Sequence, residues 1–119
     1  DHAFYNQFNG IEDLAHALVA YAQGNPVGCG ALKLFNTQAM EVKRMYVLTG
    51  QRGKGIAKQI LKALEQWAAE MGVKKLILET GLKQPEAIAL YKKSGYEIIE
   101  NYGPYVGINN SRCFEKELG

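Results

Sequence analysis

The stretch of sequence that decides the fold is MYVLTGQRGKGIA, residues 45–57. It joins a strand-like segment to one with helical spacing, and three glycines and two cations lie between them. Glycine permits positive φ and lets a ligand approach the backbone closely. The first amides of a helix have no internal partners, and with the helix dipole they attract anions. This junction therefore predicts an anion-binding loop suited to a pyrophosphate.

The chain before this junction reads as an antiparallel meander. Three apolar or alternating segments cover residues 16–23, 27–35 and 39–48, with turn residues at 24–26 and 36–37. Because the connections are short, we expect neighbouring strands to pair directly.

The chain after the junction changes to helical spacing. Residues 54–71 carry an apolar stripe that predicts an amphipathic helix, closed by Gly72; the stripe consists of Ile56, Ala57, Ile60, Leu61, Leu64, Trp67, Ala68 and Met71.

The remaining segments complete a mixed sheet. Residues 74–80 form a continuous apolar run, as in a strand buried on both faces. A second helix is predicted over 84–94, with Pro85 in its first turn and Gly95 at its end. Short strands follow at 96–99 and 112–118. The fold class is α+β: a mixed, mostly antiparallel sheet flanked by helices, in the order β-β-β-α-β-α-β-β.

Composition favours one globular domain over residues 1–119. The chain is 47% hydrophobic and 22% charged, and its net charge of +2 gives no electrostatic case for nucleic acid or an anionic membrane. No apolar run reaches the roughly 20 residues of a membrane helix, and the N-terminus has no signal-peptide pattern. Cys29 and Cys113 are too few for a disulfide framework or a zinc site. We expect a cytoplasmic protein without a metal.

The spacing of the glycine loop separates three kinds of phosphate-binding site. A nucleotide-hydrolase loop needs GxxxxGK followed by Ser or Thr, but Gly50 is followed by QRGKGI. A dinucleotide fingerprint needs GxGxxG, and the run that begins at Gly53 has Lys58 in the last glycine position. The pattern that fits is Gln/Arg-x-x-Gly-x-Gly/Ala, from Arg52 to Ala57.

This pattern resembles the acyl-CoA pyrophosphate loop of the GNAT superfamily of N-acetyltransferases. The strand at 41–47 is similar to the family's central strand, which splays from its neighbour to admit the acyl thioester. Residues 84–96 resemble the family's Asn-x-x-Ala-x-x-Leu-Tyr-x-x-x-Gly-Phe/Tyr segment, with Gln84 in place of Asn. The runs 78–81 and 111–116 resemble those of bacterial small-molecule acetyltransferases.

The resemblance covers residues 16–118 and has one departure. The superfamily begins with a strand and two helices ahead of the meander, whereas 15 residues precede His16 here. We expect this N-terminal part to be missing, which affects the acceptor pocket more than the coenzyme site.

The resemblance implies roles for individual residues. Tyr91 would protonate the departing thiolate, and Glu41 would deprotonate the amine, with Glu79 or water as the alternative base. The implied acetyl-CoA contacts are Met45, Tyr46, Val47, Arg52, Gly53, Lys54, Gly55, Ile56, Ala57, Gln84, Ala87 and Tyr91.

Plainer interpretations stand beside these roles. Tyr91 shares a helical face with Ala87 and Leu90, as a core residue would. Tyr102 and Tyr105 would edge the acceptor site, where substrate contact and loop anchoring remain open. By the two-residue period of a strand, Glu41 is expected to share a face with Lys43, Met45 and Val47.

The expected function is direct transfer of acetyl from acetyl-CoA to a primary amine of a small molecule or peptide. The alternative is a non-catalytic acyl-CoA-binding or sensor domain of the same fold. We expect no nucleic-acid or membrane partner, and a homodimer is a possible assembly.

Overall fold

The computed structural model describes residues 16–119, which begin with the predicted meander. Strands β1 (His16–Ala22), β2 (Asn25–Leu34) and β3 (Ala39–Val47) pair antiparallel in sequence order. The turn between β1 and β2 is tight because Gln23 and Gly24 both take positive φ, 53° and 81°. The predicted meander is confirmed.

The second half of the chain adds the helices and the parallel step. Helix α2 (Ile56–Glu70) leads to β4 (Lys75–Gly81), which runs parallel to β3. The remaining elements are α3 (Pro85–Lys93), β5 (Glu97–Ile99) and β6 (Ser111–Glu117), with single 3-10 turns at Thr49–Gln51 and Gly103–Tyr105. The six strands lie in the order β1-β2-β3-β4-β6-β5. The predicted fold class and element order are both confirmed.

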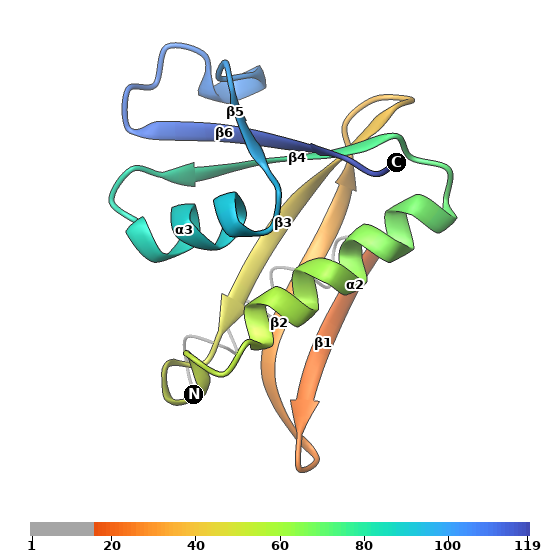
Figure 1. Ribbon diagram of the computed structural model, residues 1–119, viewed down its shortest axis with the longest axis vertical. Helices are drawn as coiled ribbons and strands as arrows, with labels where there is room; N and C mark the ends of the chain where they lie inside the picture. The colour runs from red at the N-terminus through yellow and green to blue at the C-terminus, as the bar shows by residue number, and fades with distance from the viewer. Residues whose placement is uncertain (1–15) are drawn as a thin grey trace.

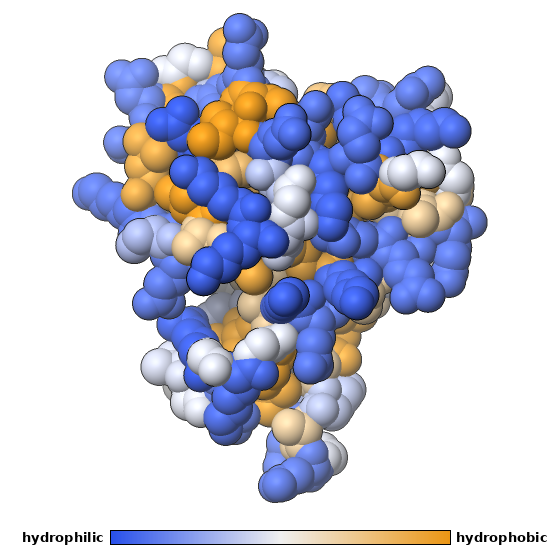
Figure 2. Space-filling view, viewed as in Figure 1, coloured by the Kyte–Doolittle hydropathy of each residue, from blue (hydrophilic) through white to orange (hydrophobic). Residues whose placement is uncertain are grey.

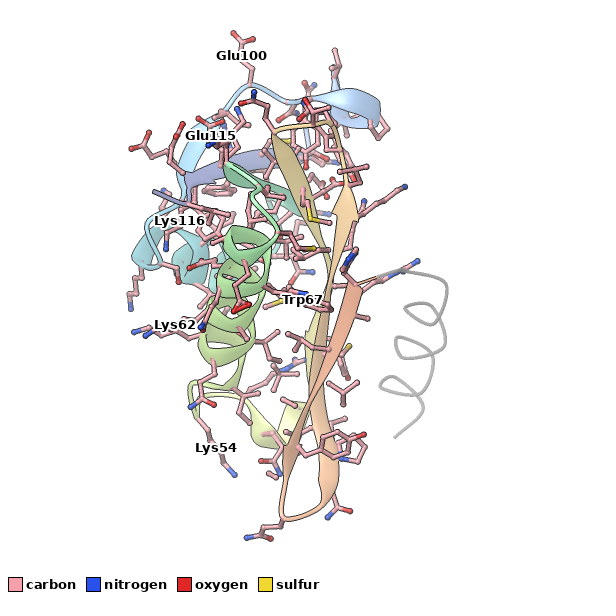
Figure 3. The ribbon with its side chains drawn as sticks, turned by 90° about the vertical axis from the view of Figure 1, so that its right-hand side faces the viewer. Lys54, Lys62, Trp67, Glu100, Glu115 and Lys116 are labelled. Atoms are coloured by element: carbon pink, nitrogen blue, oxygen red, sulfur yellow. The ribbon has the colours of Figure 1, made fainter. Side chains whose placement is uncertain are left out.

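Both helices cover one face of the sheet, and the main core lies between them and the strands. Helix α2 crosses β1, β2 and β3, and α3 lies on the same side (Figure 1), as the turned view also shows (Figure 3). Close approach of α2 depends on glycine, since a Cβ on Gly30 would lie 2.8 Å from the Ile60 side chain. The fully buried centre of this core consists of Leu32, Leu61, Leu64, Ala68, Leu76, Leu78 and Phe114.

Helix α2 is shorter at both ends than the predicted range of residues 54–71. It begins at Ile56 because Gly55, with φ of 79°, is the left-handed residue in front of it. Met71 is the C-cap residue and is 39% exposed, so its predicted place at the end of the buried apolar stripe is wrong. The helix ends at Glu70, so Met71 does not continue the helical face that packs on the sheet. Gly72 does take the predicted left-handed conformation, with φ of 82°.

A β-bulge in β3 overturns the predicted facing of its side chains. Cys29 pairs with Tyr46 and Ala31 with Lys43, so Arg44 and Met45 together oppose Gly30. The extra residue reverses the alternation beyond it. Met45 and Val47 consequently pack toward the helices with Met40 and Val42. Glu41 lies on the other face, and the predicted shared face with Met45 and Val47 is wrong.

Strands β3 and β4 separate after three paired residues. Their register runs from Ala39 opposite Lys75 to Glu41 opposite Ile77 and ends there. The rest of β3 pairs only with β2, and the rest of β4 pairs with β6. The parallel pair therefore opens into a V whose mouth lies toward the glycine loop and α3.

Candidate active site

The opening between β3 and β4 is part of one large cavity. It has a volume of about 1100 Å³ and is bounded by β3, β4, α3 and the loop before α2. Figure 2 shows the surface hollowed between α3 and that loop. The cavity is lined by all but one of the predicted site residues: Glu41, Met45, Tyr46, Val47, Arg52, Gly53, Gly55, Ile56, Ala57, Gln84, Ala87 and Tyr91.

Lys54 is the predicted site residue that the structure places apart from the cavity. Its Nζ donates to Gln51 Oε1 over 3.3 Å on the exposed side of the loop. An acetyl-CoA contact through Lys54 remains a prediction.

The glycine loop lines the end of the cavity that lies before α2. Gly53 and Gly55 have φ of 81° and 79°, and a Cβ on either would meet nothing within 4 Å. Their requirement for glycine is thus conformational, with open space in front of them. The bond from the Gln59 amide to the Gly55 carbonyl spans 3.1 Å, so the amides of residues 56–58 precede the helix's own hydrogen-bonding pattern. This end of the cavity suits an anion.

Arg52 adds a fixed positive charge to the same end. Its Nε donates to the Val47 carbonyl over 2.8 Å, and its guanidinium lies 5.4 Å from the centre of the Tyr46 ring. That bond uses one of the five N–H groups of a guanidinium. The arginine is therefore anchored to the end of β3 beside the loop amides.

Tyr91 lines the helix-covered side of the cavity. It is 6% exposed and packs against Tyr96 and Phe114, with ring centres 5.8 and 5.9 Å away. Burial raises the pKa of its hydroxyl to about 12. The core role and the functional role are compatible, because the same side chain packs in the core and borders the cavity.

Glu41 lies at the inner end of the V and is held by two neighbours. Its Oε2 accepts a 2.6 Å hydrogen bond from the Tyr102 hydroxyl, and its Oε1 lies 3.4 Å from Lys43 Nζ. Glu41 is 8% exposed. Burial alone would lower the pKa of Lys43, but its hydrogen bond to Tyr105 and the charge of Glu41 raise it instead. Lys43 therefore stays charged beside the carboxylate.

Glu79, the alternative base, also lines the cavity. Its Oε2 accepts a 2.6 Å hydrogen bond from Ser111 Oγ. Glu79 is two residues beyond Ile77, the partner of Glu41 in the sheet, so the two carboxylates share the face away from the helices. Tyr91 and the carboxylates approach the opening from opposite faces.

The loop between β5 and β6 is anchored to β3 by the two tyrosines for which two roles were open. The Tyr102 hydroxyl donates to Glu41, and the Tyr105 hydroxyl accepts a 3.0 Å bond from Lys43 Nζ. Anchoring is thus observed for both, and Tyr105 also lines the cavity.

The cavity is also lined by residues that the sequence did not indicate as site residues, and they include Lys33, Arg44, Lys58, Thr80, Glu86 and Leu90. Helical spacing from Ala87 and Tyr91 could have indicated Leu90. Nothing in the sequence could have indicated Arg44, because an arginine within a strand is not a residue type that predicts a bulge.

Histidine and cysteine have structural surroundings in the described part of the chain. His16 packs edge-on to Trp67 with ring centres 5.1 Å apart, and His2 lies outside the described residues. Cys29 and Cys113 are buried, and burial raises the pKa of both thiols.

Among residues 16–119, no three His, Cys, Asp or Glu side chains gather as metal ligands. No helix there is long and apolar enough to cross a membrane.

Two known proteins are similar to this chain in sequence. The chain is 42% identical over 102 residues to an IAA acetyltransferase of Azospirillum brasilense, covering 85% of this chain and 67% of that protein. It is also 42% identical over 90 residues to the uncharacterised N-acetyltransferase YjgM of Escherichia coli, covering 72% and 53%. The chain thus spans between about half and two thirds of these relatives.

Solved structures share the fold. A Klebsiella pneumoniae protein assigned as an acyl-CoA N-acyltransferase superimposes with a TM-score of 0.84 at 34% identity, covering 98% of this chain and 86% of that one. A GNAT family acetyltransferase of Elizabethkingia anophelis with acetyl-CoA bound gives 0.79 at 19% identity, covering 94% and 82%.

A family model covers most of the chain. The model described as "Acetyltransferase (GNAT) family" matches residues 1–96, which include the glycine loop and Tyr91. The chain belongs to the GNAT family of acetyltransferases.

Proposed function

We propose that this chain is an N-acetyltransferase that moves acetyl from acetyl-CoA directly to a primary amine. The observation that carries the proposal is the parting of β3 and β4 beyond Glu41 and Ile77. One cavity thereby joins the amide-rich loop, Tyr91 and two carboxylates. The names of the relatives support acetyl transfer, and the acetyl-CoA bound to the Elizabethkingia protein supports the donor.

The loop end of the cavity would hold the pyrophosphate. The amides from Gly53 to Lys58 and the Arg52 guanidinium supply hydrogen bonds and positive charge. The edge of β3 from Met45 to Val47 is not paired with β4, so its backbone groups can bind the pantetheine arm and polarise the thioester carbonyl. Losing one such donor to a developing oxyanion typically costs about 10²–10³ in rate.

The transfer balances without an enzyme-bound acyl group. The amine nitrogen forms a bond to the thioester carbonyl carbon, and the bond from carbon to sulfur breaks. The amine gives up one proton, and the sulfur takes one to leave as the CoA thiol. Because amine and thioester meet in one cavity, no covalent intermediate on the protein is needed.

Tyr91 is suited to donate to the departing sulfur. A thiol has an ordinary pKa of about 8.5. Burial raises the pKa of Tyr91 to about 12, so its hydroxyl stays protonated at neutral pH. Since proton transfer from so weak an acid is uphill, the hydroxyl acts first as a hydrogen-bond donor to the developing negative charge.

Glu41 and Glu79 are placed to take the amine proton from the other face. A primary ammonium with a pKa near about 10 is almost wholly protonated at neutral pH, so a base or a water chain must remove a proton before attack. Glu41 would act through water because Tyr102 and Lys43 already contact its two oxygens.

The test is turnover, measured as release of the CoA thiol with acetyl-CoA and a panel of primary amines. We expect thiol and acetylated amine in equal amounts. Binding of acetyl-CoA with neither product would favour the non-catalytic acyl-CoA-binding domain. A cytoplasmic location, a homodimer and the absence of nucleic-acid partners stay predictions.

A further inference from the structure

A group of cations lies beside the two carboxylates on the face where the amine would enter. Lys33 is directly opposite Glu41 in the pairing of β2 with β3, and Ala31 is opposite Lys43. Directly opposed residues project from the same face of a sheet, so Lys33 and Lys43 flank Glu41. Arg44 follows at the bulge, and all three cations line the cavity.

Arg44 holds an unusual backbone conformation for its side chain. Its φ is 58°, in the left-handed region that favours glycine. The backbone carbonyl of Arg44 has a hydrogen-bond partner, because the Cys29 thiol donates to it over 3.4 Å. A glycine would adopt this φ without strain. Residues with strained backbone conformations cluster at sites where the side chain contacts a ligand or takes part in function. The long cation at this position therefore points to a ligand contact.

The charges on this face are only partly matched within the protein. Lys43 is paired with Glu41, whereas Arg44 is exposed and forms no ion pair among residues 16–119, and the same is true of Lys33. Glu79 accepts a hydrogen bond from the neutral hydroxyl of Ser111 and forms no ion pair among residues 16–119. This face of the cavity therefore carries the unpaired cations Arg44 and Lys33 beside two carboxylates that can face an ammonium group.

From this arrangement we propose that the acceptor is an amine that also carries a carboxylate. Arg44, assisted by Lys33, binds the carboxylate, while the amine faces Glu41 and Glu79. A guanidinium suits this task because its planar fork binds a carboxylate with two parallel hydrogen bonds. The inference rests on the proposed function and narrows it to amino-acid-like acceptors.

The coenzyme phosphates have their own cations. Arg52 and Lys58 line the cavity at the glycine loop, after the end of β3. Arg44 lies within β3, separated from that loop by residues 45–48. A phosphate role for Arg44 is the competing outcome that the experiment must exclude.

The experiment compares L-amino acids with their α-carboxamides, with Arg44→Asn as the main variant. Asparagine tolerates the left-handed region, so this variant keeps the bulge. Arg44→Gly removes the strain as well as the charge and is a second variant that folds readily. Lys62→Gln is the matched control, because Lys62 is an exposed cation of α2 on the far side of the helix from the sheet (Figure 3).

We expect both Arg44 variants to raise KM for the amino acid by about 10- to 100-fold, the effect of losing hydrogen bonds to a charged group. KM for the carboxamide and the Kd for acetyl-CoA should not change, nor should any constant in Lys62→Gln. Taking the ratio of variant to wild type for each acceptor cancels the different reactivity of the two amines.

Equal changes for the two acceptors, or a weaker Kd for acetyl-CoA, would overturn the proposal. Calorimetric titration of the CoA-bound protein with the same amino acids provides a readout independent of turnover. Binding that Arg44→Asn abolishes, without any acetylation, would contradict the proposed function alone. Wild-type protein that neither binds nor acetylates an amino acid, while it acetylates other amines, would contradict the inference alone.

Discussion

Tyr102 and Glu41, 61 positions apart in the chain, are joined by a 2.6 Å hydrogen bond from the hydroxyl to Oε2. Burial, the bond itself and the charge of Glu41 raise the pKa of Tyr102, so its hydroxyl remains a donor. The carboxylate is thereby fixed in orientation at the inner end of the V. Water is the remaining route from Glu41 to an amine.

The first prediction separates the two candidate bases. Glu41→Gln should leave the Kd for acetyl-CoA unchanged and lower kcat/KM for the amine by roughly 10²-fold, the lower range for a general base. Partial recovery is expected as pH rises toward the pKa of the amine, about 10, because free amine accumulates. The measurement is thiol release across the pH range.

Glu79→Gln is the matched control for this experiment. Both residues are carboxylates in the same cavity, and each accepts a 2.6 Å hydroxyl bond. A wild-type pH profile in Glu41→Gln together with a loss in Glu79→Gln would move the role to Glu79. Wild-type kinetics in both variants would leave water as the base.

The second prediction concerns the hydroxyl of Tyr91. Tyr91→Phe keeps the ring packing and should change the free energy of unfolding at pH 7 by less than about 1 kcal/mol. It should lower kcat by about 10²–10⁴-fold if the hydroxyl assists departure of the thiolate. Single-turnover kinetics isolate the chemical step from product release.

Tyr96→Phe is the control for this experiment, because it should lower stability and leave kcat unchanged. The Tyr96 hydroxyl donates to Glu65 over 2.8 Å and the residue does not border the cavity. Its loss should cost about 1 kcal/mol of stability and leave kcat unchanged. A Tyr91→Phe enzyme with kcat within twofold of wild type would make Tyr91 a core residue only.

The third prediction follows from the raised pKa of Tyr91, about 12 in the folded protein. An unfolded tyrosine ionises near pH 10, so the unfolded state loses its proton first. The contribution to stability is complete below pH 10 and is lost as pH rises toward 12, by up to about 2–3 kcal/mol. Urea unfolding of wild type and Tyr91→Phe at pH 9, 10 and 11 should show a steeper decline in wild type. Parallel declines would show that Tyr91 ionises equally in both states.

The fourth prediction tests the glycine loop by means of two glycines with the same geometry. Gly55 and Gly24 have φ of 79° and 81°, and neither would crowd a Cβ. Gly55→Leu and Gly24→Leu should therefore lose similar stability, roughly 1–2 kcal/mol for left-handed backbone. Only Gly55→Leu should lose calorimetric binding of acetyl-CoA, since its side chain would project where the phosphates approach. Equal affinities in the two folded variants would refute the loop as the phosphate site.

Much of the fold was predictable because its signals are local. The glycine loop and the α3 segment are each contained in a short run of residues, and local spacing was enough to place them. The order of elements along the chain was predicted correctly, and both helices begin and end within one or two residues of the predicted positions. The left-handed glycines at 72 and 95 were predictable because they end periodic segments.

The inner geometry of the site was not predictable for a physical reason. The bulge occurs at Arg44, a residue type that gives no turn or glycine signal, and one extra residue reverses every side chain beyond it. The bonds of Glu41 to Tyr102 and of Lys43 to Tyr105 join segments more than 60 positions apart. Such contacts depend on where the loop between β5 and β6 returns to the sheet.

A crystal structure of this chain with acetyl-CoA bound tests the central claim most directly. The account predicts the pyrophosphate on the amides that follow Arg52 and the thioester in the opening between β3 and β4. The sulfur should lie within hydrogen-bond reach of the Tyr91 hydroxyl, about 3–3.5 Å. A pyrophosphate bound elsewhere, or a thioester that stays outside the two strands and away from Tyr91, would contradict it.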